Sequence, residues 1–287
     1  FILMVIITIF SVLISILYDR KELGILSLIG AFAVPLMVSN GAGNYIFLFT
    51  YLLIIDIGFL IVSLNRKWLI VNILSFVFTH IFLLYWIISQ PLNSVNSIHL
   101  LVFASLFYLT YYIVNIIRTI KEETILSTIS VVLFVANTFI YFGQGIYLLH
   151  QYHSQYQGLF TILLAAINLI TGWLILKKNT IDKNIVYLFI GLTLTFVTLA
   201  GPIQLNGNYI TLFWAAESVL LLWLSSKTKN NDFKIGFIIV TQLMIISLLM
   251  DFSNIYNSYS EKPILLTPIV NKGFITGIFC AICLASS

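Results

Sequence analysis

Long apolar segments, separated by short polar ones, follow one another along the whole chain. A helix of roughly 20 apolar residues crosses a bilayer core of about 30 Å. Only 8% of the 287 residues are charged and 60% are hydrophobic, and so few charges cannot cover the surface of a soluble fold. The sequence therefore predicts an all-α, polytopic transmembrane helix bundle of about 10–11 helices, paired into hairpins by short loops. The segments expected to span are 1–18, 23–39, 45–64, 68–89, 97–118, 124–149, 158–176, 184–203, 209–226, 235–250 and 268–287.

The charged residues also bear on partners and chain ends. The net charge of +4 is dispersed, whereas a nucleic-acid-binding surface needs Lys and Arg clustered on one face. We therefore expect the protein to interact with the lipid bilayer and not with nucleic acid. Association with other membrane or envelope subunits is compatible with the sequence. The chain begins with Phe1 and stops inside an apolar segment, which predicts a single transmembrane region, 1–287, within a longer protein.

Basic residues recur in every second loop. Cytoplasmic loops of membrane proteins are enriched in Lys and Arg, so these loops are expected to face the cytoplasm and residue 1 the outer side of a bacterial inner membrane. The intervening loops near 40–44, 90–96, 150–157 and 204–208 contain neither residue. The alternating loops contain Arg20, Lys21, Arg66, Lys67, Arg118, Lys121, Lys177, Lys178, Lys183, Lys227, Lys229 and Lys234.

One short motif occurs twice. Residues 43–46 (GNYI) recur as residues 207–210, and the leucine and phenylalanine at 48–49 recur at 212–213 with the same offset. Each copy joins two apolar segments at a turn on the predicted outer side, which indicates a parallel internal repeat with copies 23–67 and 187–231. Asn44 and Asn208 then occupy equivalent positions in the two copies, and both are candidate site residues at the outer turns. The alternative is a chance match, because apolar helices align easily.

The same segments carry a family resemblance. Residues 30–35 (GAFAVP), 47–53 (FLFTYLL), 202–207 (PIQLNG), 212–217 (LFWAAE) and 268–274 (PIVNKGF) resemble the bacterial multi-pass membrane family known as domain of unknown function 2339 (DUF2339). The resemblance implies an integral protein of the cytoplasmic membrane and supplies no catalytic residues. The family usually has a neutral polar residue where this chain has Asp56, so a role for that carboxylate is not inherited.

Two acidic residues lie near the middle of expected spans. An ionised carboxylate at the bilayer centre costs roughly 2.5–3.5 kcal/mol, so Asp56 and Glu217 are expected to face the bundle interior, a polar partner or water. They are candidates for an ion or substrate path, together with Trp214 in the family-like WAAE stretch. The alternative is that hydrogen-bonded acids only fix helix packing.

Two further polar residues within expected spans are candidates for the same path. His80 is the one histidine clearly inside a span, and Gln144 lies between Gly143 and Gly145, where the backbone can line a cavity. For both, helix–helix hydrogen bonding or close packing is the alternative.

Known motifs for catalysis and for metal or cofactor binding are weak here. His150 and His153 have metal-like spacing but no acid or cysteine nearby to complete a site. Cys280 and Cys283 form a C-x-x-C in an apolar helix, where small packing residues are the simpler interpretation. The sequence therefore predicts no catalytic residue, no metal site and no cofactor.

Three classes of function are compatible with these features. We favour transport or translocation of a small or envelope-related substrate through a polar path containing Glu217. The alternatives are a structural membrane subunit of a larger complex, and a membrane enzyme acting on lipid-linked envelope precursors. The enzyme needs a base on the outer side, for which His150 and His153 are the candidates, and the lack of a known motif argues against it.

Overall fold

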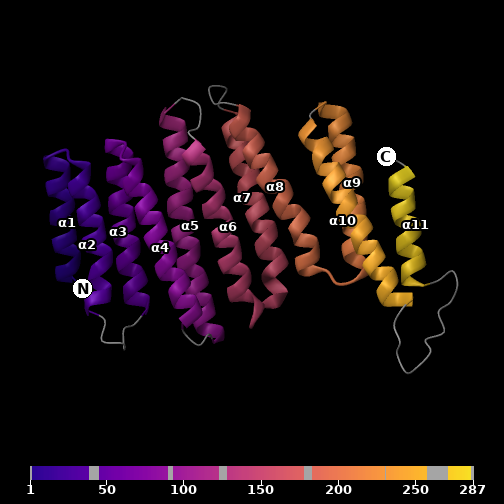
Figure 1. Cartoon of the computed structure of the whole chain (residues 1–287), viewed down its shortest axis with the longest axis horizontal. Coiled ribbons are helices and arrows are strands. Elements are labelled where there is room, and N and C mark those ends of the chain that lie inside the picture. The colour runs from indigo at the N-terminus through magenta and orange to yellow at the C-terminus, as the bar shows by residue number, and fades with distance from the viewer. Residues whose placement is uncertain are drawn as a thin grey trace. The chain divides into compact units, whose positions relative to one another are not determined.

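The computed structural model describes residues 2–38, 45–89, 93–122, 128–177, 183–229, 231–256 and 271–285. These residues form 11 α-helices and one short 3-10 helix and contain no strand (Figure 1), which confirms the all-α prediction. The helices are α1 (Ile2–Leu17), α2 (Lys21–Val38), α3 (Tyr45–Arg66), α4 (Leu69–Ser89), α5 (Ser94–Glu122), α6 (Thr128–His150), η1 (Ser154–Tyr156), α7 (Gln157–Leu176), α8 (Lys183–Gln204), α9 (Asn208–Thr228), α10 (Asn231–Tyr256) and α11 (Lys272–Ala285).

Eight of these helices, α3 to α10, are long and apolar enough to cross a membrane. In lipid, every backbone polar group must be satisfied within the segment, and an uninterrupted helix does this. The described parts of α1 and α11 are shorter apolar helices. The 14 residues of α11 extend about 21 Å at 1.5 Å per residue, which is less than the bilayer core.

One boundary differs clearly from the sequence prediction. The expected span ends at residue 250, but α10 continues to Tyr256. The reason is that Asp251 is buried against a neighbouring helix rather than solvated. At α11, the Asn271 side chain accepts a hydrogen bond from the Phe274 backbone N–H at 2.7 Å, an N-cap that fixes the start of that helix.

The chain divides into two compact units. Unit 1 comprises 1–154 and 178–185 and contains α1 to α6; unit 2 comprises 155–177 and 186–287 and contains α7, most of α8, and α9 to α11. The predicted repeat copies correspond to α2–α3 in unit 1 and α8–α9 in unit 2. Each copy is a helical pair, while their common origin remains a prediction.

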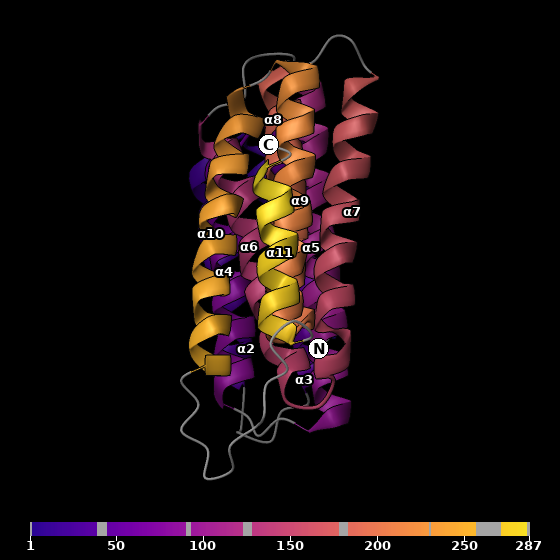
Figure 2. The same ribbon diagram turned by 90° about the vertical axis from the view of Figure 1, so that its right-hand side faces the viewer.

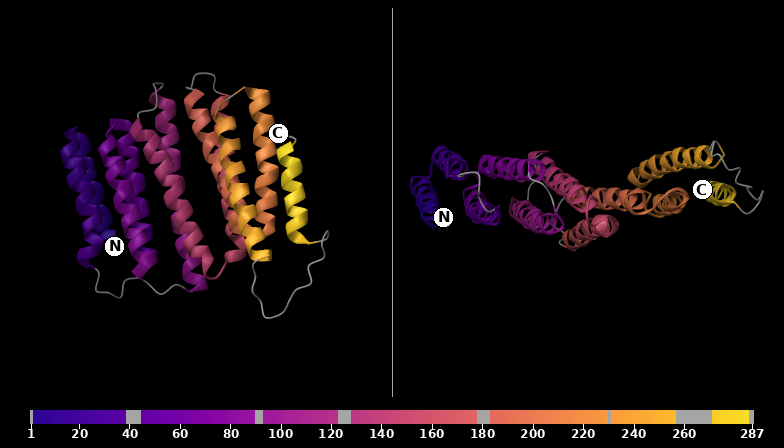
Figure 3. Two further views of the ribbon diagram at one scale, coloured as in Figure 1. Left: turned by 45° about the vertical axis from the view of Figure 1, so that its right-hand side comes forward. Right: turned by 90° about the horizontal axis from the view of Figure 1, so that it is seen from below.

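In unit 1, helices close in sequence pack together, and α3 also contacts α1, α2 and α5. Figure 3 shows their axes running in nearly the same direction. A buried apolar cluster from α3, α4, α5 and α6 stabilises this packing, and consists of Leu60, Phe76, Tyr111, Val114 and Leu133. In unit 2, α9 lies beside both α10 and α11 (Figure 2).

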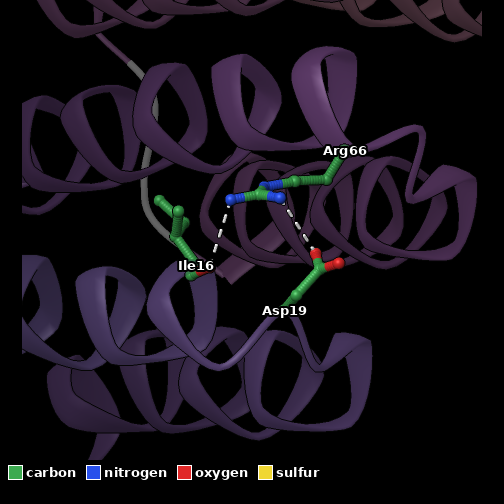
Figure 4. A network of polar contacts seen from close by, with 3 residues as sticks. All are labelled: Ile16, Asp19 and Arg66. Atoms are coloured by element: carbon green, nitrogen blue, oxygen red, sulfur yellow. Dashed lines mark hydrogen bonds and ion pairs between the residues drawn. The ribbon is translucent and has the colours of Figure 1, made fainter.

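At one end of unit 1, Arg66 connects α3 to the end of α1 (Figure 4). Its guanidinium lies 3.2 Å from Asp19 and donates to the Ile16 carbonyl oxygen at 3.2 Å. The contact satisfies one of the free carbonyls at the end of α1. Both charged side chains are well exposed, and such surface pairs contribute only about 0–1 kcal/mol.

Alanine substitution is expected to affect the stability of the protein differently at two glycines of α8. A Cβ at Gly201 would lie 2.5 Å from the Phe213 ring, whereas a Cβ at Gly191 would meet nothing within 4 Å. We expect Gly201→Ala to lower the free energy of unfolding by about 1–3 kcal/mol, because α8 and α9 must separate. Gly191→Ala is expected to be neutral or to stabilise by up to ~1 kcal/mol through helix propensity. Reversible unfolding in mixed micelles measures both, and equal effects would contradict the packing argument.

Candidate functional site

Asp56 of α3 is fully buried in unit 1 and is surrounded by hydroxyl groups. Ser75 and Thr79 of α4 each donate to one of its carboxyl oxygens, and the Thr79 hydroxyl lies 2.6 Å from Oδ2. The Tyr111 hydroxyl of α5 contacts Ser75 at 2.8 Å and Thr79 at 3.2 Å. These four side chains form a closed arrangement of contacts, which we call the Asp56 ring.

His80 and Gln144 lie beside this ring. The Gln144 side-chain N–H group lies 3.4 Å from His80 Nδ1. Because an amide N–H donates, His80 then accepts at Nδ1 and carries its hydrogen on Nε2. The imidazole packs edge-on against Phe76 and lies 6.1 Å from the Tyr111 ring, centroid to centroid. The structure thus brings three predicted residues, Asp56, His80 and Gln144, into one neighbourhood.

Several buried polar atoms around His80 have no hydrogen-bond partner among the described residues. The Asn137 amide lies close to the imidazole, but its Oδ1 atom and His80 Nε2 do not meet hydrogen-bond geometry. Gln144 Oε1 also lacks a partner there, whereas the Tyr108 hydroxyl lies within reach of the Thr138 hydroxyl. The His80, Asn137 and Gln144 side chains are at least 97% buried, so this part of unit 1 presents unused donors and acceptors.

Further polar side chains continue from the ring toward the end of unit 1 that carries Arg66. Asn72 donates to Asn115 at 3.5 Å, and Arg118 donates to the Ser63 hydroxyl at 2.8 Å. Ser63 is seven residues from Asp56, which corresponds to about 10 Å along α3. We call the whole set the polar column: Ser63, Asn72, Asn115, Arg118, the Asp56 ring, His80, Tyr108, Asn137 and Gln144.

Arg118 corrects one expectation from the sequence. It was assigned to a basic loop, but it lies within α5 with only 5% of its surface exposed. Its hydrogen bond to Ser63 draws the guanidinium into the end of the column. The long side chain allows this, because its aliphatic part packs while its charged end reaches a polar group.

Sequence reasoning missed the neutral members of the column. Ser75, Thr79 and Tyr111 are common residues that scarcely alter mean hydropathy. A signal was present nonetheless, because 72, 75, 79 and 80 repeat at the helical period and share one face of α4. The same period places 108, 111, 115 and 118 together on α5.

Glu217 and Trp214 meet through Thr198 in unit 2. The Thr198 hydroxyl donates to Glu217 Oε1 at 2.5 Å, and the Trp214 indole N–H donates to the Thr198 carbonyl oxygen at 3.2 Å. Glu217 is 8% exposed, and its Oε2 has no partner among the described residues. The acid is therefore buried with half of its acceptor capacity unused.

A groove runs past this acid in unit 2. Its volume is about 470 Å³ and its walls come from α8, α9 and α10. Thr198 is part of the lining, so Glu217 lies one side chain behind the wall. The lining is mainly aliphatic, with Asp232 among the few polar residues.

Of the two asparagines predicted at the outer turns, the structure describes only Asn208. Asn208 begins α9, and its side-chain amide donates to Thr276 of α11 at 3.1 Å, which ties these two helices together. The preceding Gly207 has φ of +57°, a conformation that favours glycine. Asn44 lies outside the described residues.

The weaker candidates form no site in the described part of the chain. No group of three or more His, Cys, Asp or Glu side chains there is placed to hold a metal ion. The His153 imidazole lies 3.4 Å from a backbone oxygen, that of Ser94. Cys280 and Cys283 form no disulfide bond and are buried in an apolar cluster with Ala215 and Met244.

Apolar helices of spanning length that bury their polar side chains against one another define a polytopic α-helical membrane protein in a lipid bilayer. The chain belongs to the family described as "Predicted membrane protein (DUF2339)", whose family model matches residues 1–283. The resemblance found in the sequence is thereby confirmed. No curated protein and no solved structure matches the chain.

Proposed function

We propose that this membrane protein is a transporter, and that a small polar substrate passes along the polar column of unit 1. The observation that carries the proposal is the set of three buried polar atoms without a well-formed hydrogen bond, on His80, Asn137 and Gln144. Leaving a buried donor or acceptor unsatisfied costs about 1–3 kcal/mol. A water molecule or a polar substrate at this place would satisfy several of them together.

The remainder of the column supports the same function. Asp56 provides an ionisable group within a span, which is a typical feature of ion and proton paths. Polar groups then continue for about two helical turns to Arg118. A structural subunit accounts for the paired side chains of the column, but it does not require the unpaired ones.

Glu217 supports a second candidate path, in unit 2. The unpaired Oε2 atom and the adjoining aliphatic groove suit an envelope-related substrate that has both an alkyl part and a hydrogen-bond donor. This candidate retains the path through Glu217 that the sequence favours. It predicts that water or substrate reaches position 217 from the groove.

Thiol accessibility in intact cells tests both paths. We expect a cysteine at position 144 or 217, in the full chain with Cys280 and Cys283 replaced by alanine, to react with a membrane-impermeant maleimide. The matched controls are Gly143→Cys and Ala216→Cys, because these neighbours lie at the same depth but are exposed on the outside of their helices. A thiol facing lipid stays unionised and unreactive.

The outcomes separate the classes of function. Labelling at 144 but not at 143 supports the column of unit 1, and labelling at 217 but not at 216 supports the groove of unit 2. If neither 144 nor 217 reacts with impermeant or permeant reagents while the protein remains folded, the interior is dry. The structural-subunit alternative would then replace transport.

A further inference from the structure

The groove of unit 2 runs lengthwise between α8 and α10. Its lining advances in step along both helices, from Tyr187 to Leu199 on α8 and from Asp232 to Leu243 on α10. At 1.5 Å per residue these stretches extend about 17–18 Å, and half of a bilayer core is about 15 Å thick. Asp232 lies in the first turn of α10. The groove therefore begins at one membrane surface and ends near the middle of the membrane.

Glycine residues on the two facing helices explain the space. A Cβ at Gly236 of α10 would lie 3.6 Å from a Leu221 methyl group of α9, which is an ordinary contact. A Cβ at Gly191 of α8 would meet nothing within 4 Å. Helix α10 thus packs closely against α9 at this level, whereas α8 leaves room that a larger side chain at position 191 would fill.

The hydroxyl groups in the lining already donate within the protein. Thr195 donates to the Gly191 carbonyl oxygen at 2.9 Å, and Thr198 donates to Glu217 Oε1 at 2.5 Å. A hydroxyl carries one hydrogen, so neither threonine has one left for a ligand. The deep part of the groove therefore suits an alkyl chain. Its aliphatic lining comprises Ile190, Leu194, Leu199, Ile239, Val240 and Leu243.

The groove opens on the outside of the helices. Tyr187, Ile235 and Ile239 belong to its lining, and about half of the surface of each is exposed. Acyl chains surround such surfaces in a bilayer. An unfilled gap would leave its lining without partner atoms for dispersion contacts, so an acyl chain from the adjacent leaflet is the occupant that fits.

Both signs of charge occur near the end of the groove at the membrane surface. The carboxylate of Asp232 belongs to the lining and is exposed. Lys229 and Lys234 are near it in the sequence and are also exposed, but they do not line the groove. An ammonium group forms a charge-assisted hydrogen bond with a carboxylate, and a lysine does so with a phosphate. A headgroup with one ammonium and one phosphate therefore complements this end better than a purely anionic headgroup.

We infer that the groove is a binding site for a phospholipid with a primary ammonium headgroup, of the phosphatidylethanolamine class. One acyl chain lies between α8 and α10 and ends near Thr198, and the ammonium group binds the Asp232 carboxylate. The inference goes beyond the transport proposed above, because a lipid can bind here whether or not a substrate passes Glu217. A substrate of that second path with an alkyl part would compete with the lipid for the same groove.

Native mass spectrometry tests the site on the full chain. The protein is released from nanodiscs that contain equal amounts of phosphatidylethanolamine and phosphatidylglycerol with identical acyl chains. We expect the wild-type protein to retain phosphatidylethanolamine in preference, and Gly191→Leu to lose it. Gly143→Leu is the matched control, because a side chain there also meets open space but lies on the outside of α6, and it is expected to retain the lipid. Asp232→Asn is expected to retain a lipid and to lose the preference for the ammonium headgroup.

Photo-cross-linking locates the lipid in the wild-type protein, independently of any variant. Phosphatidylethanolamine with a diazirine on one acyl chain is expected to form adducts within 187–199 or 232–243 that unlabelled phosphatidylethanolamine suppresses.

Each contrary result has a defined meaning. Adducts elsewhere only, or equal lipid retention in wild type and Gly191→Leu, would overturn the site. Preference for phosphatidylglycerol, or an unaltered preference in Asp232→Asn, would overturn the role of Asp232. A wild-type dimer that Gly191→Leu dissociates would show that a second copy of the chain covers the groove instead of a lipid. Thiol labelling at positions 144 and 217 tests transport separately, so either proposal can fail while the other stands.

Discussion

Asp56→Ala is expected to lower the free energy of unfolding by about 3 kcal/mol or more, the largest single-residue effect that we predict for this protein. The substitution removes the acceptor of the Ser75 and Thr79 hydroxyls. Each buried donor left unsatisfied costs about 1–3 kcal/mol, and the lost side-chain volume adds a cavity term. Reversible unfolding in mixed micelles measures the change.

Two companion variants make this prediction specific. Asp56→Asn keeps the size of the side chain and one acceptor oxygen. It is therefore expected to lower the free energy of unfolding by less than half as much as Asp56→Ala. Asp19→Ala removes an exposed acid of a surface ion pair, and its effect is expected to stay within about 1 kcal/mol. If Asp56→Ala and Asp19→Ala had equal effects, the ring would contribute little to folding.

The double variant His80→Leu/Gln144→Leu is expected to separate stability from function. It removes two buried atoms that lack partners, His80 Nε2 and Gln144 Oε1, and one long contact of 3.4 Å. Replacing unsatisfied polar groups by apolar groups of similar size is neutral or stabilising, so we expect a gain of about 1–3 kcal/mol. Proton flux into proteoliposomes, driven by a potassium diffusion potential, is expected to fall to the level of empty vesicles.

The control for this variant introduces leucine at the two neighbouring positions, which lie at the same depth in the membrane but on the exposed side of their helices. Ile81→Leu/Gly143→Leu changes the neighbouring residues, which are exposed, and is expected to leave proton flux unchanged. A structural role for His80 and Gln144 predicts the opposite pattern, with lower stability and unaltered flux. The two measurements together therefore distinguish a transporter from a scaffold.

Site residues of this kind are expected to reduce stability for the sake of function. In unit 1, the paired part of the column, with Asp56 and Arg118, resembles a well-packed polar interior. The unpaired part around His80 does not. Within the column, the substrate is therefore expected to make its hydrogen bonds beside His80, while the paired side chains of the ring border the path.

The sequence by itself determined the class of protein and most of the helix boundaries. Hydropathy is a local property summed over about 20 residues, and a spanning segment must satisfy its backbone hydrogen bonds internally. Helix formation in lipid therefore needs no knowledge of neighbouring helices. The same local argument singled out Asp56 and Glu217, because an acid inside an apolar run is costly wherever the helix packs.

Only the tertiary structure decided which polar residues meet. His80 and Gln144 are 64 residues apart, and Ser75, Thr79 and Tyr111 lack any charge that would mark them. Whether a hydroxyl faces a neighbouring helix or lipid depends on the rotation and crossing of the helices, which packing decides. For the same reason Asp251, which lies beyond the expected span 235–250, and Arg118, which was placed in a basic loop, are buried against neighbouring helices.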